Sequence, residues 1–292
     1  MPEVRDVALE GGGFDFRARV YPAAAPNGAA LVWLHGGAFM FGDLDMPEAD
    51  QVGRRLSEGG ITVVSVDYTL APMDAVRQLH PPPPGADVPS PEQLQAAAAG
   101  ARARFPAASL QVVVVFDWVI EHAAQLGVDP ARVALGGASA GGNLCAGAAM
   151  RLRDRAMAVP SILSLVYPVV HNPLPIAGAE LEGLLAGLPE FLTFPVEAMV
   201  AINANYLGEA IDAEGYAFAG GHDLWGLPST LIINADRDRL RASGEAFGAE
   251  LALAGVDVQV VRMRGAVHGF LNDVGDASAE QTLATLARAV GA

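Results

Sequence analysis

The sequence contains no lysine and only one cysteine, and 17% of its 292 residues are charged. A chain without lysine cannot form the glycine-rich phosphate loop that ends in lysine. Cys145 has no partner for an intramolecular disulfide, which excludes the small secreted scaffolds that disulfides hold together. No Cys-x-x-Cys or His-x-x-Glu-His spacing occurs in the sequence, so we expect neither a metal ion nor a cofactor.

Acidic residues outnumber basic ones by 33 to 18, and the formal net charge is −15. An acidic surface repels nucleic-acid phosphates and anionic lipids, so neither nucleic acid nor a membrane is an expected partner. The N-terminal residues contain no apolar signal segment, and no apolar run reaches the roughly 18 residues of a membrane span. The sequence therefore predicts a cytoplasmic protein.

Hydrophobic residues make up 52% of the chain, enough for the core of one large domain covering residues 1–292. Segments rich in β-branched residues alternate with helix-length segments. The expected strands are residues 14–21, 29–35, 61–68, 132–137, 162–170, 229–235 and 256–263, and the expected helices are residues 47–58, 110–126, 140–155, 241–254 and 277–290. This alternation predicts the α/β class, with a mostly parallel central sheet flanked by helices. No helix separates the first two strands, so we expect them to form an antiparallel edge.

Two regions interrupt the alternation. Residues 73–104 contain four consecutive prolines, which neither a helix interior nor a central strand accepts. Residues 171–226 carry helix and turn signals without strand alternation. Each region is either surface elaboration or a cap or lid segment over an active site.

Residues 137–141 read GASAG, which fits the pattern G-x-S-x-G. The segment follows an expected strand and precedes an expected helix, as a nucleophile elbow requires. The sharp turn raises the hydroxyl of Ser139 above the sheet, at a helix N-terminus whose dipole favours negative charge. A glycine-rich packing turn with Ser139 as the helix cap is the alternative interpretation.

The sequence HGGAF at residues 35–39 directly follows another expected strand. Two adjacent glycines leave backbone N–H groups accessible to a ligand oxygen. Combined with the serine elbow, this pattern predicts an oxyanion hole formed by the N–H groups of Gly36, Gly37 and Ala140. A simple turn between strand and helix is the alternative.

A nucleophilic serine needs a general base, and the base needs an acid that orients it. Of the six histidines, His268 follows the last expected strand, where a sheet of this order presents a loop at its catalytic edge. The acid is expected after the preceding strand, where Asp236 and Asp238 are both candidates. The chain order serine, aspartate, histidine is typical of α/β-hydrolases.

These motifs resemble the bacterial hormone-sensitive-lipase-like esterases (family IV) of the α/β-hydrolase fold. The matching segments, in the family's order, are HGGAF at 35–39, DYTLAP at 67–72, GGASAGG at 136–142, YPVV at 167–170, DRLR at 238–241 and AVHGF at 266–270. The resemblance implies that Asp238, which opens the family's D-x-L-R motif, is the acid rather than Asp236. It also implies a carboxylesterase that needs no cofactor and forms a homodimer.

Three features depart from the family's pattern. Ala138 stands where the family usually has an acidic residue or threonine, which can alter hydrogen bonding around the nucleophile. Only 34 residues precede His35, so we expect the family's two N-terminal cap helices to be missing or much reduced. The segments LAP and FPAA, normally close together, are separated here, which makes residues 73–104 an insertion.

We therefore expect a serine hydrolase that cleaves carboxylic esters of short to medium acyl chains through an acyl-enzyme on Ser139. In this hypothesis His268 is the general base and Asp238 orients its ring. One alternative is an amidase, arylformamidase or carbamate hydrolase with the same triad. The other is a non-catalytic ligand-binding protein on this fold, against which the presence of all three triad residues argues.

Overall fold

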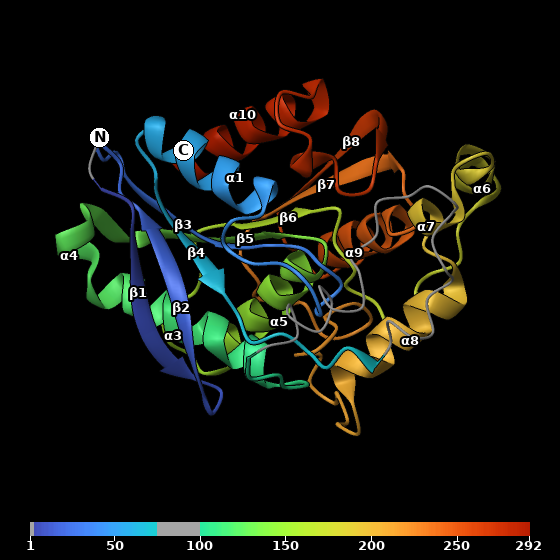
Figure 1. Ribbon diagram of the computed structural model, residues 1–292, viewed down its shortest axis with the longest axis horizontal. Coiled ribbons are helices and arrows are strands. Elements are labelled where there is room, and N and C mark those ends of the chain that lie inside the picture. Colours follow the sequence, from blue (N-terminus) through green and yellow to red (C-terminus); the bar gives the residue numbers. More distant parts are fainter. Residues whose placement is uncertain (1–2, 75–99) are drawn as a thin grey trace.

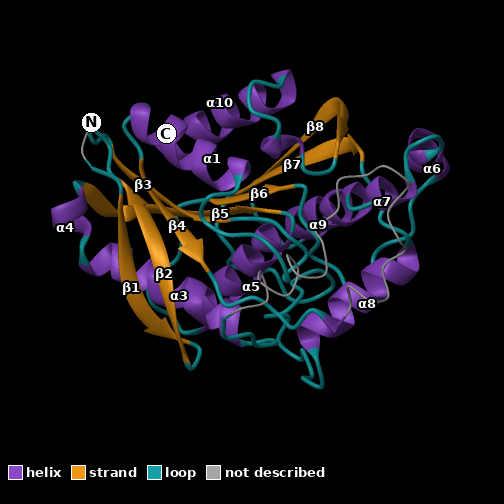
Figure 2. Cartoon of the chain, viewed as in Figure 1, coloured by secondary structure: helices purple, strands orange, loops and turns teal. Residues whose placement is uncertain are grey.

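The computed structural model describes residues 3–74 and 100–292, which form an eight-stranded sheet with helices on both faces (Figure 1, Figure 2). The strand order across the sheet is β1-β2-β4-β3-β5-β6-β7-β8. The strands are β1 (Arg5–Gly11), β2 (Phe14–Tyr21), β3 (Gly28–Leu34), β4 (Thr62–Asp67), β5 (Val128–Ala138), β6 (Leu163–Val166), β7 (Thr230–Arg237) and β8 (Val258–Val267). In this order, every pair of neighbouring strands from β4 through β3 to β8 is parallel. This confirms the predicted α/β class with a mostly parallel sheet.

Helices cover the two faces of the sheet and enclose one hydrophobic core on each. They are α1 (Pro47–Glu58), α3 (Ala107–Glu121), α4 (Ala123–Leu126), α5 (Ala140–Asp154), α9 (Arg241–Leu253) and α10 (Ala277–Gly291). α1 and α10 lie on one face, and α3, α5 and α9 lie on the other (Figure 2). Leu31 and Trp33 of β3 belong to the first core, whereas Val32 and Leu34 belong to the second. Side chains alternate along a strand, so a sheet covered on both sides needs apolar residues at every position of its central strands.

The antiparallel edge of the sheet differs from the prediction. β2 pairs antiparallel with β1 and β4, while β3 lies in the interior, parallel to β4 and β5. The predicted antiparallel pairing of residues 14–21 with residues 29–35 is therefore wrong. Burial explains the placement: every residue of β3 after Gly28 is buried, whereas exposed and buried residues alternate in the first half of β2. A strand that is apolar on both faces is stable inside the sheet, and a half-polar strand is stable at its edge.

Residues 171–226, a candidate cap or lid segment, contain three further helices. These are α6 (Ala179–Leu185), α7 (Glu190–Thr193) and α8 (Val196–Leu207). They lie together at one end of the molecule, beyond α5 and α9 (Figure 1). No helix in the described ranges is long and apolar enough to cross a membrane.

The predicted insertion, residues 73–104, lies largely outside the described residues, but the chain at its two ends is described. At one end, Asn205 of α8 donates its Nδ2 to the carbonyl oxygen of Pro72 at 2.5 Å. At the other end, the Phe105 N–H donates to the carbonyl oxygen of Tyr206 at 2.8 Å. Both ends of the insertion therefore contact α8.

Candidate active site

Ser139 occupies the sharp turn between β5 and α5. Its backbone has φ of 53° and ψ of −118°, and such a conformation costs a residue with a side chain on the order of 1–3 kcal/mol. The turn also requires glycine on both sides. A Cβ on Gly137 would lie 2.6 Å from the backbone of Gly141, and a Cβ on Gly141 would lie 2.2 Å from the carbonyl oxygen of Leu34. A strained serine between a buried strand and a helix N-terminus has the geometry of a nucleophile elbow.

His268 lies between Ser139 and Asp238 and is hydrogen-bonded to both. Its Nε2 is 3.0 Å from Ser139 Oγ, and its Nδ1 is 2.7 Å from Asp238 Oδ2. An ionised carboxylate only accepts hydrogen bonds, so Nδ1 carries the ring proton and Nε2 can accept the proton of the serine hydroxyl. The structure thus brings together the residues predicted as nucleophile, base and acid.

Strand order explains why residues so far apart in sequence meet. Ser139 follows β5, Asp238 follows β7 and His268 follows β8. These strands belong to one parallel array, and the carboxyl ends of parallel strands lie at a common edge. Asp238 is fully buried there, and its second carboxylate oxygen accepts the Leu240 N–H at 2.9 Å.

Asp236, the other candidate acid, has different partners. Its carboxylate forms ion pairs with Arg241 at 3.3 Å and with Arg262 at 3.2 Å, and it accepts the Gly265 N–H at 2.9 Å. These contacts connect β7 to the neighbouring strand β8. The arrangement therefore favours Asp238 as the acid beside His268, and it gives Asp236 a structural role.

Two aromatic side chains that the sequence analysis did not single out contact the histidine. The ring of Tyr167 lies 4.7 Å from the ring of His268, and the ring of Phe194 lies 4.6 Å from it, measured between centroids. Tyr167 belongs to the YPVV segment after β6, so its position after a strand was an available signal. Phe194 lies between α7 and α8, and nothing in the sequence near it indicates the contact.

The amide of Gly36 has a different partner from the one predicted. Its N–H donates to Glu48 Oε2 at 3.2 Å, which engages the one proton that it could offer to an oxyanion. Gly37 and Ala38 have φ of 118° and 52°, and their N–H groups have no acceptor within the described residues. Ala140 is the first residue of α5, where N–H groups have no acceptor inside the helix. The sequence predicted Gly36, Gly37 and Ala140 as oxyanion donors, and the geometry favours Gly37, Ala38 and Ala140 as the candidates.

Glu48 is a site residue that sequence reasoning missed. It lies in the first turn of α1 and is 1% exposed. Burial raises the pKa of its carboxyl group to about 8, and the hydrogen bonds from Gly36 and Trp33 oppose part of that rise. The available signal was its spacing, because Glu48, Val52 and Leu56 are four residues apart and share the buried face of the helix.

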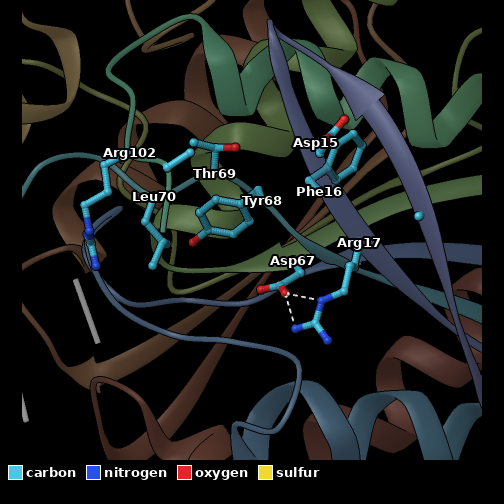
Figure 3. A pocket seen from close by; sticks show the side chains of 10 residues that line it. Asp15, Phe16, Arg17, Asp67, Tyr68, Thr69, Leu70 and Arg102 are labelled. Carbon is cyan, nitrogen blue, oxygen red and sulfur yellow. Dashed lines mark hydrogen bonds and ion pairs between the residues drawn. The ribbon is translucent and has the colours of Figure 1, made fainter. Parts of the chain in front are cut away.

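A cavity of about 360 Å³ opens beside the antiparallel edge of the sheet (Figure 3). Arg17 and Asp67 form an ion pair at its wall, with 2.7 Å between Nη2 and Oδ2. Tyr68 also lines it and donates its hydroxyl to the carbonyl oxygen of His35 at 3.0 Å. Neither the triad nor the oxyanion donors line this cavity. The cavity is therefore separate from the site around Ser139.

Comparison with known proteins agrees with this geometry. The family model described as alpha/beta hydrolase fold matches residues 31–80 and 99–272. The chain belongs to this family. The gap in the match, residues 81–98, falls inside the predicted insertion.

Individual relatives cover nearly the whole chain. Carboxylesterase NlhH of Mycobacterium tuberculosis is 33% identical over 294 residues, which cover 95% of this chain and 80% of that protein. Esterase LipI of the same species is 32% identical over 284 residues, which cover 94% and 77%. The solved esterase of Pyrobaculum calidifontis superposes with a TM-score of 0.80 at 30% identity, covering 100% of this chain and 85% of that one. The resemblance to the hormone-sensitive-lipase-like esterases of this fold is confirmed.

Proposed function

We propose that the protein is a carboxylesterase that cleaves esters of short to medium acyl chains through an acyl-enzyme on Ser139. The observation that carries the proposal is the continuous hydrogen-bonded chain from Ser139 Oγ through His268 to Asp238 at a strained elbow. The esterases among its relatives support the same reaction.

The first half of the reaction acylates the serine. Ser139 Oγ attacks the ester carbonyl carbon while His268 Nε2 takes the hydroxyl proton. The carbonyl oxygen becomes an oxyanion, which the N–H groups of Gly37, Ala38 and Ala140 stabilise. When the tetrahedral intermediate collapses, His268 returns the proton to the alkoxide, and the alcohol leaves.

The second half repeats these steps with water. His268 accepts a proton from a water molecule, which attacks the acyl carbon, and the acid leaves as Ser139 Oγ recovers its proton. Throughout, Asp238 holds the ring orientation and stabilises the imidazolium. The proposed reaction consumes the small-molecule ester and one water molecule, and it needs no cofactor.

Chain-length preference and the choice between ester and amide are tested together. Purified protein is assayed with p-nitrophenyl acetate, butyrate and octanoate and with a matched p-nitroanilide. Turnover of the short esters with negligible anilide hydrolysis supports the proposal. Faster anilide turnover would assign an amidase, and binding without turnover would assign a ligand-binding protein.

Residues 73–104 and 171–226 are proposed as the cover of the active site. Phe194 of the second segment contacts the ring of His268. Pro72 and Phe105, which flank the first segment, contact α8 of the second. Closed covers exclude water and shape the acyl site.

The homodimer implied by the family resemblance and the cytoplasmic location remain predictions. Sedimentation equilibrium of the purified protein tests the first. Cell fractionation with an antibody against the protein tests the second.

A further inference from the structure

Glu48 connects the first turn of α1 to the strand and loop that lead into the site. Its Oε2 accepts the Gly36 N–H at 3.2 Å, and its Oε1 accepts the indole N–H of Trp33 at 3.3 Å. The Glu48 N–H in turn donates to Asn272 Oδ1 at 3.3 Å, in the segment that follows His268. One buried residue therefore bonds to two of the loops that carry catalytic groups, the loop after β3 and the loop after β8.

The carboxyl group lies close behind the nucleophile. A Cβ built on Gly36 would lie 3.3 Å from Glu48 Oε2 and 3.4 Å from the Cβ of Ser139. The distance from Glu48 Oε2 to the Cβ of Ser139 is therefore at most the sum of these two distances. Ala138, the residue before the nucleophile, has only a methyl group and offers no side-chain acceptor for the Gly36 proton.

A buried carboxyl group at this place is costly for stability. Glu48 is almost fully buried, and no basic side chain in the described part of the chain bonds to it. Taking an unpaired carboxylate out of water costs folding free energy, and apolar residues of similar volume usually pack at lower cost. Its hydrogen bonds with the Gly36 N–H and with the buried indole N–H of Trp33 distinguish Glu48 from the apolar residues on the same helix face.

We propose that Glu48 is a positioning residue for ester hydrolysis: its carboxyl group holds the Gly36 amide and so orients the Gly37 and Ala38 N–H groups toward the oxyanion. The inference rests on the proposed function. The peptide that links His35 to Gly36 is held at its other end as well, because the His35 carbonyl oxygen accepts the Tyr68 hydroxyl at 3.0 Å. A peptide fixed at both ends sets the direction of the amides that follow it.

The protonated form of Glu48 is the active form. A negative charge behind the oxyanion hole opposes the negative charge that develops on the substrate oxygen. Burial favours the neutral acid and raises the pKa of Glu48 to about 8. As the pH rises through that value, ionised Glu48 accumulates and oxyanion stabilisation falls, so kcat declines on the alkaline side.

The neighbouring titratable groups do not produce the same decline. Tyr68, after β4, and Tyr167, after β6, are the described groups on which the charge of Glu48 acts. Burial raises the pKa of both phenols well above 10, so both stay neutral while Glu48 ionises. His35, beside Gly36, has a pKa lowered by burial and is neutral in the same range.

The first experiment compares variants with p-nitrophenyl butyrate from below to above the pKa of Glu48. Glu48→Ala should lower kcat by ~10–100-fold with little change in KM, because the oxyanion donors lose their orientation. Glu48→Gln keeps an acceptor for Gly36 but cannot ionise, so it should retain most of the activity and lose the alkaline decline. Asp50→Asn is the matched control on the same helix, since the Asp50 carboxylate bonds to the Tyr21 hydroxyl at 3.1 Å and to Arg54 at 2.7 Å, and neither partner is in a loop that carries catalytic groups.

The second experiment separates orientation from general loosening of the fold. A trifluoromethyl ketone adds Ser139 Oγ to its carbonyl carbon and forms an alkoxide in the oxyanion hole, whereas the methyl ketone analogue binds without a stable alkoxide. Glu48→Ala should weaken the trifluoromethyl ketone by the same factor as kcat/KM and leave the methyl ketone unchanged. Equal weakening of both inhibitors would overturn the positioning role.

The third experiment needs no turnover. Because Trp33 donates to the Glu48 carboxyl group, its fluorescence should titrate near pH 8, and the transition should be absent in Glu48→Gln and in Trp33→Phe. Ser139→Ala should retain it.

A protein that shows this titration but cleaves no ester would refute the proposed function and leave the ionisation of Glu48 established. If Ser139→Ala abolishes ester hydrolysis but Glu48→Ala and Glu48→Gln have the same kinetics as Asp50→Asn, the role of Glu48 is refuted and the proposed function is not.

Discussion

The ring of Phe194 meets the ring of His268 edge-on, with 4.6 Å between the centroids and 69° between the planes. Phe194 has φ of 47° and ends α7 in the left-handed region. A residue with a side chain adopts that conformation only where its surroundings require it. The segment of residues 171–226 therefore contacts His268, the proposed general base, through a backbone conformation that is itself strained.

Replacing Phe194 by alanine should lower kcat/KM by ~2–10-fold, since an edge-to-face aromatic pair contributes about 0.5–1.5 kcal/mol. The loss should be larger for octanoate than for acetate esters, because the Phe194 ring belongs to the proposed cover of the active site, which shapes the acyl site. Trp225→Ala is the matched control, as Trp225 belongs to the same segment and is 74% exposed. Equal kinetics for the two variants would show that the ring contact does not support catalysis.

Ser139→Ala should abolish ester turnover and leave the circular dichroism spectrum and melting temperature nearly unchanged. The substitution removes one hydroxyl and relies on the same glycines at the turn. Only the ~10³–10⁴-fold residual acceleration from the oxyanion hole and substrate binding should remain. Activity close to that of the wild type would disprove the assignment of the nucleophile.

Asp236, near the end of β7, and Asp238, which follows the strand, should behave differently. Asp238→Asn should reduce kcat on the order of 10⁴-fold, because an amide at this position favours the wrong tautomer of His268. Asp236→Asn should leave kcat nearly intact and lower the melting temperature, since Asp236 pairs with Arg241 and Arg262. Reversed effects would make Asp236 the acid.

The stability of the fold should depend on pH through Glu48. The pKa of Glu48 is about 8 in the folded protein, above its ordinary value of 4.5. Such a group contributes its full stabilisation of the fold at pH values below 4.5, and this contribution is lost as the pH rises through about 8. The unfolding free energy of the wild type, measured with urea, should therefore fall relative to Glu48→Gln across this window, by about 1.4 kcal/mol per pH unit. A difference that does not change with pH would mean that Glu48 titrates normally.

Replacing residues 76–99 by a short Gly-Ser linker should change the ratio of kcat/KM for butyrate over octanoate esters more than it changes stability. The deletion keeps Arg102, which donates to the carbonyl oxygens of Met40 and Ala71 at 2.9 and 2.7 Å and so supports the loop after β3. If both the ratio and the melting temperature stay unchanged, the segment is surface elaboration and does not cover the active site.

Much of the fold was predictable because it depends on short-range patterns. The expected helix at residues 47–58 and the expected strand at residues 14–21 have the observed bounds. The expected helix at residues 110–126 is instead divided at His122, whose Nδ1 lies 2.8 Å from the carbonyl oxygen of Trp118. A side chain that competes for a backbone carbonyl ends a helix without any glycine or proline signal.

The choice between Asp236 and Asp238 shows the limit of local reasoning. Both follow the same strand, two residues apart, and spacing alone left both open. The family's D-x-L-R motif favoured Asp238, and the observed contact with His268 depends on β8 lying beside β7. Pairing between strands is a property of the whole sheet, which a single loop sequence does not contain.

The sequence by itself determined the α/β alternation, the serine elbow and the order of nucleophile, acid and base, because each depends on residues a few positions apart or on their place after a strand. Only the tertiary structure decided that β3 lies inside the sheet, that Glu48 takes the Gly36 proton and that Phe194 contacts His268. Each of these is a contact between segments distant in the chain. Such contacts form when packing and strand order bring side chains together, and no periodicity within one segment encodes them.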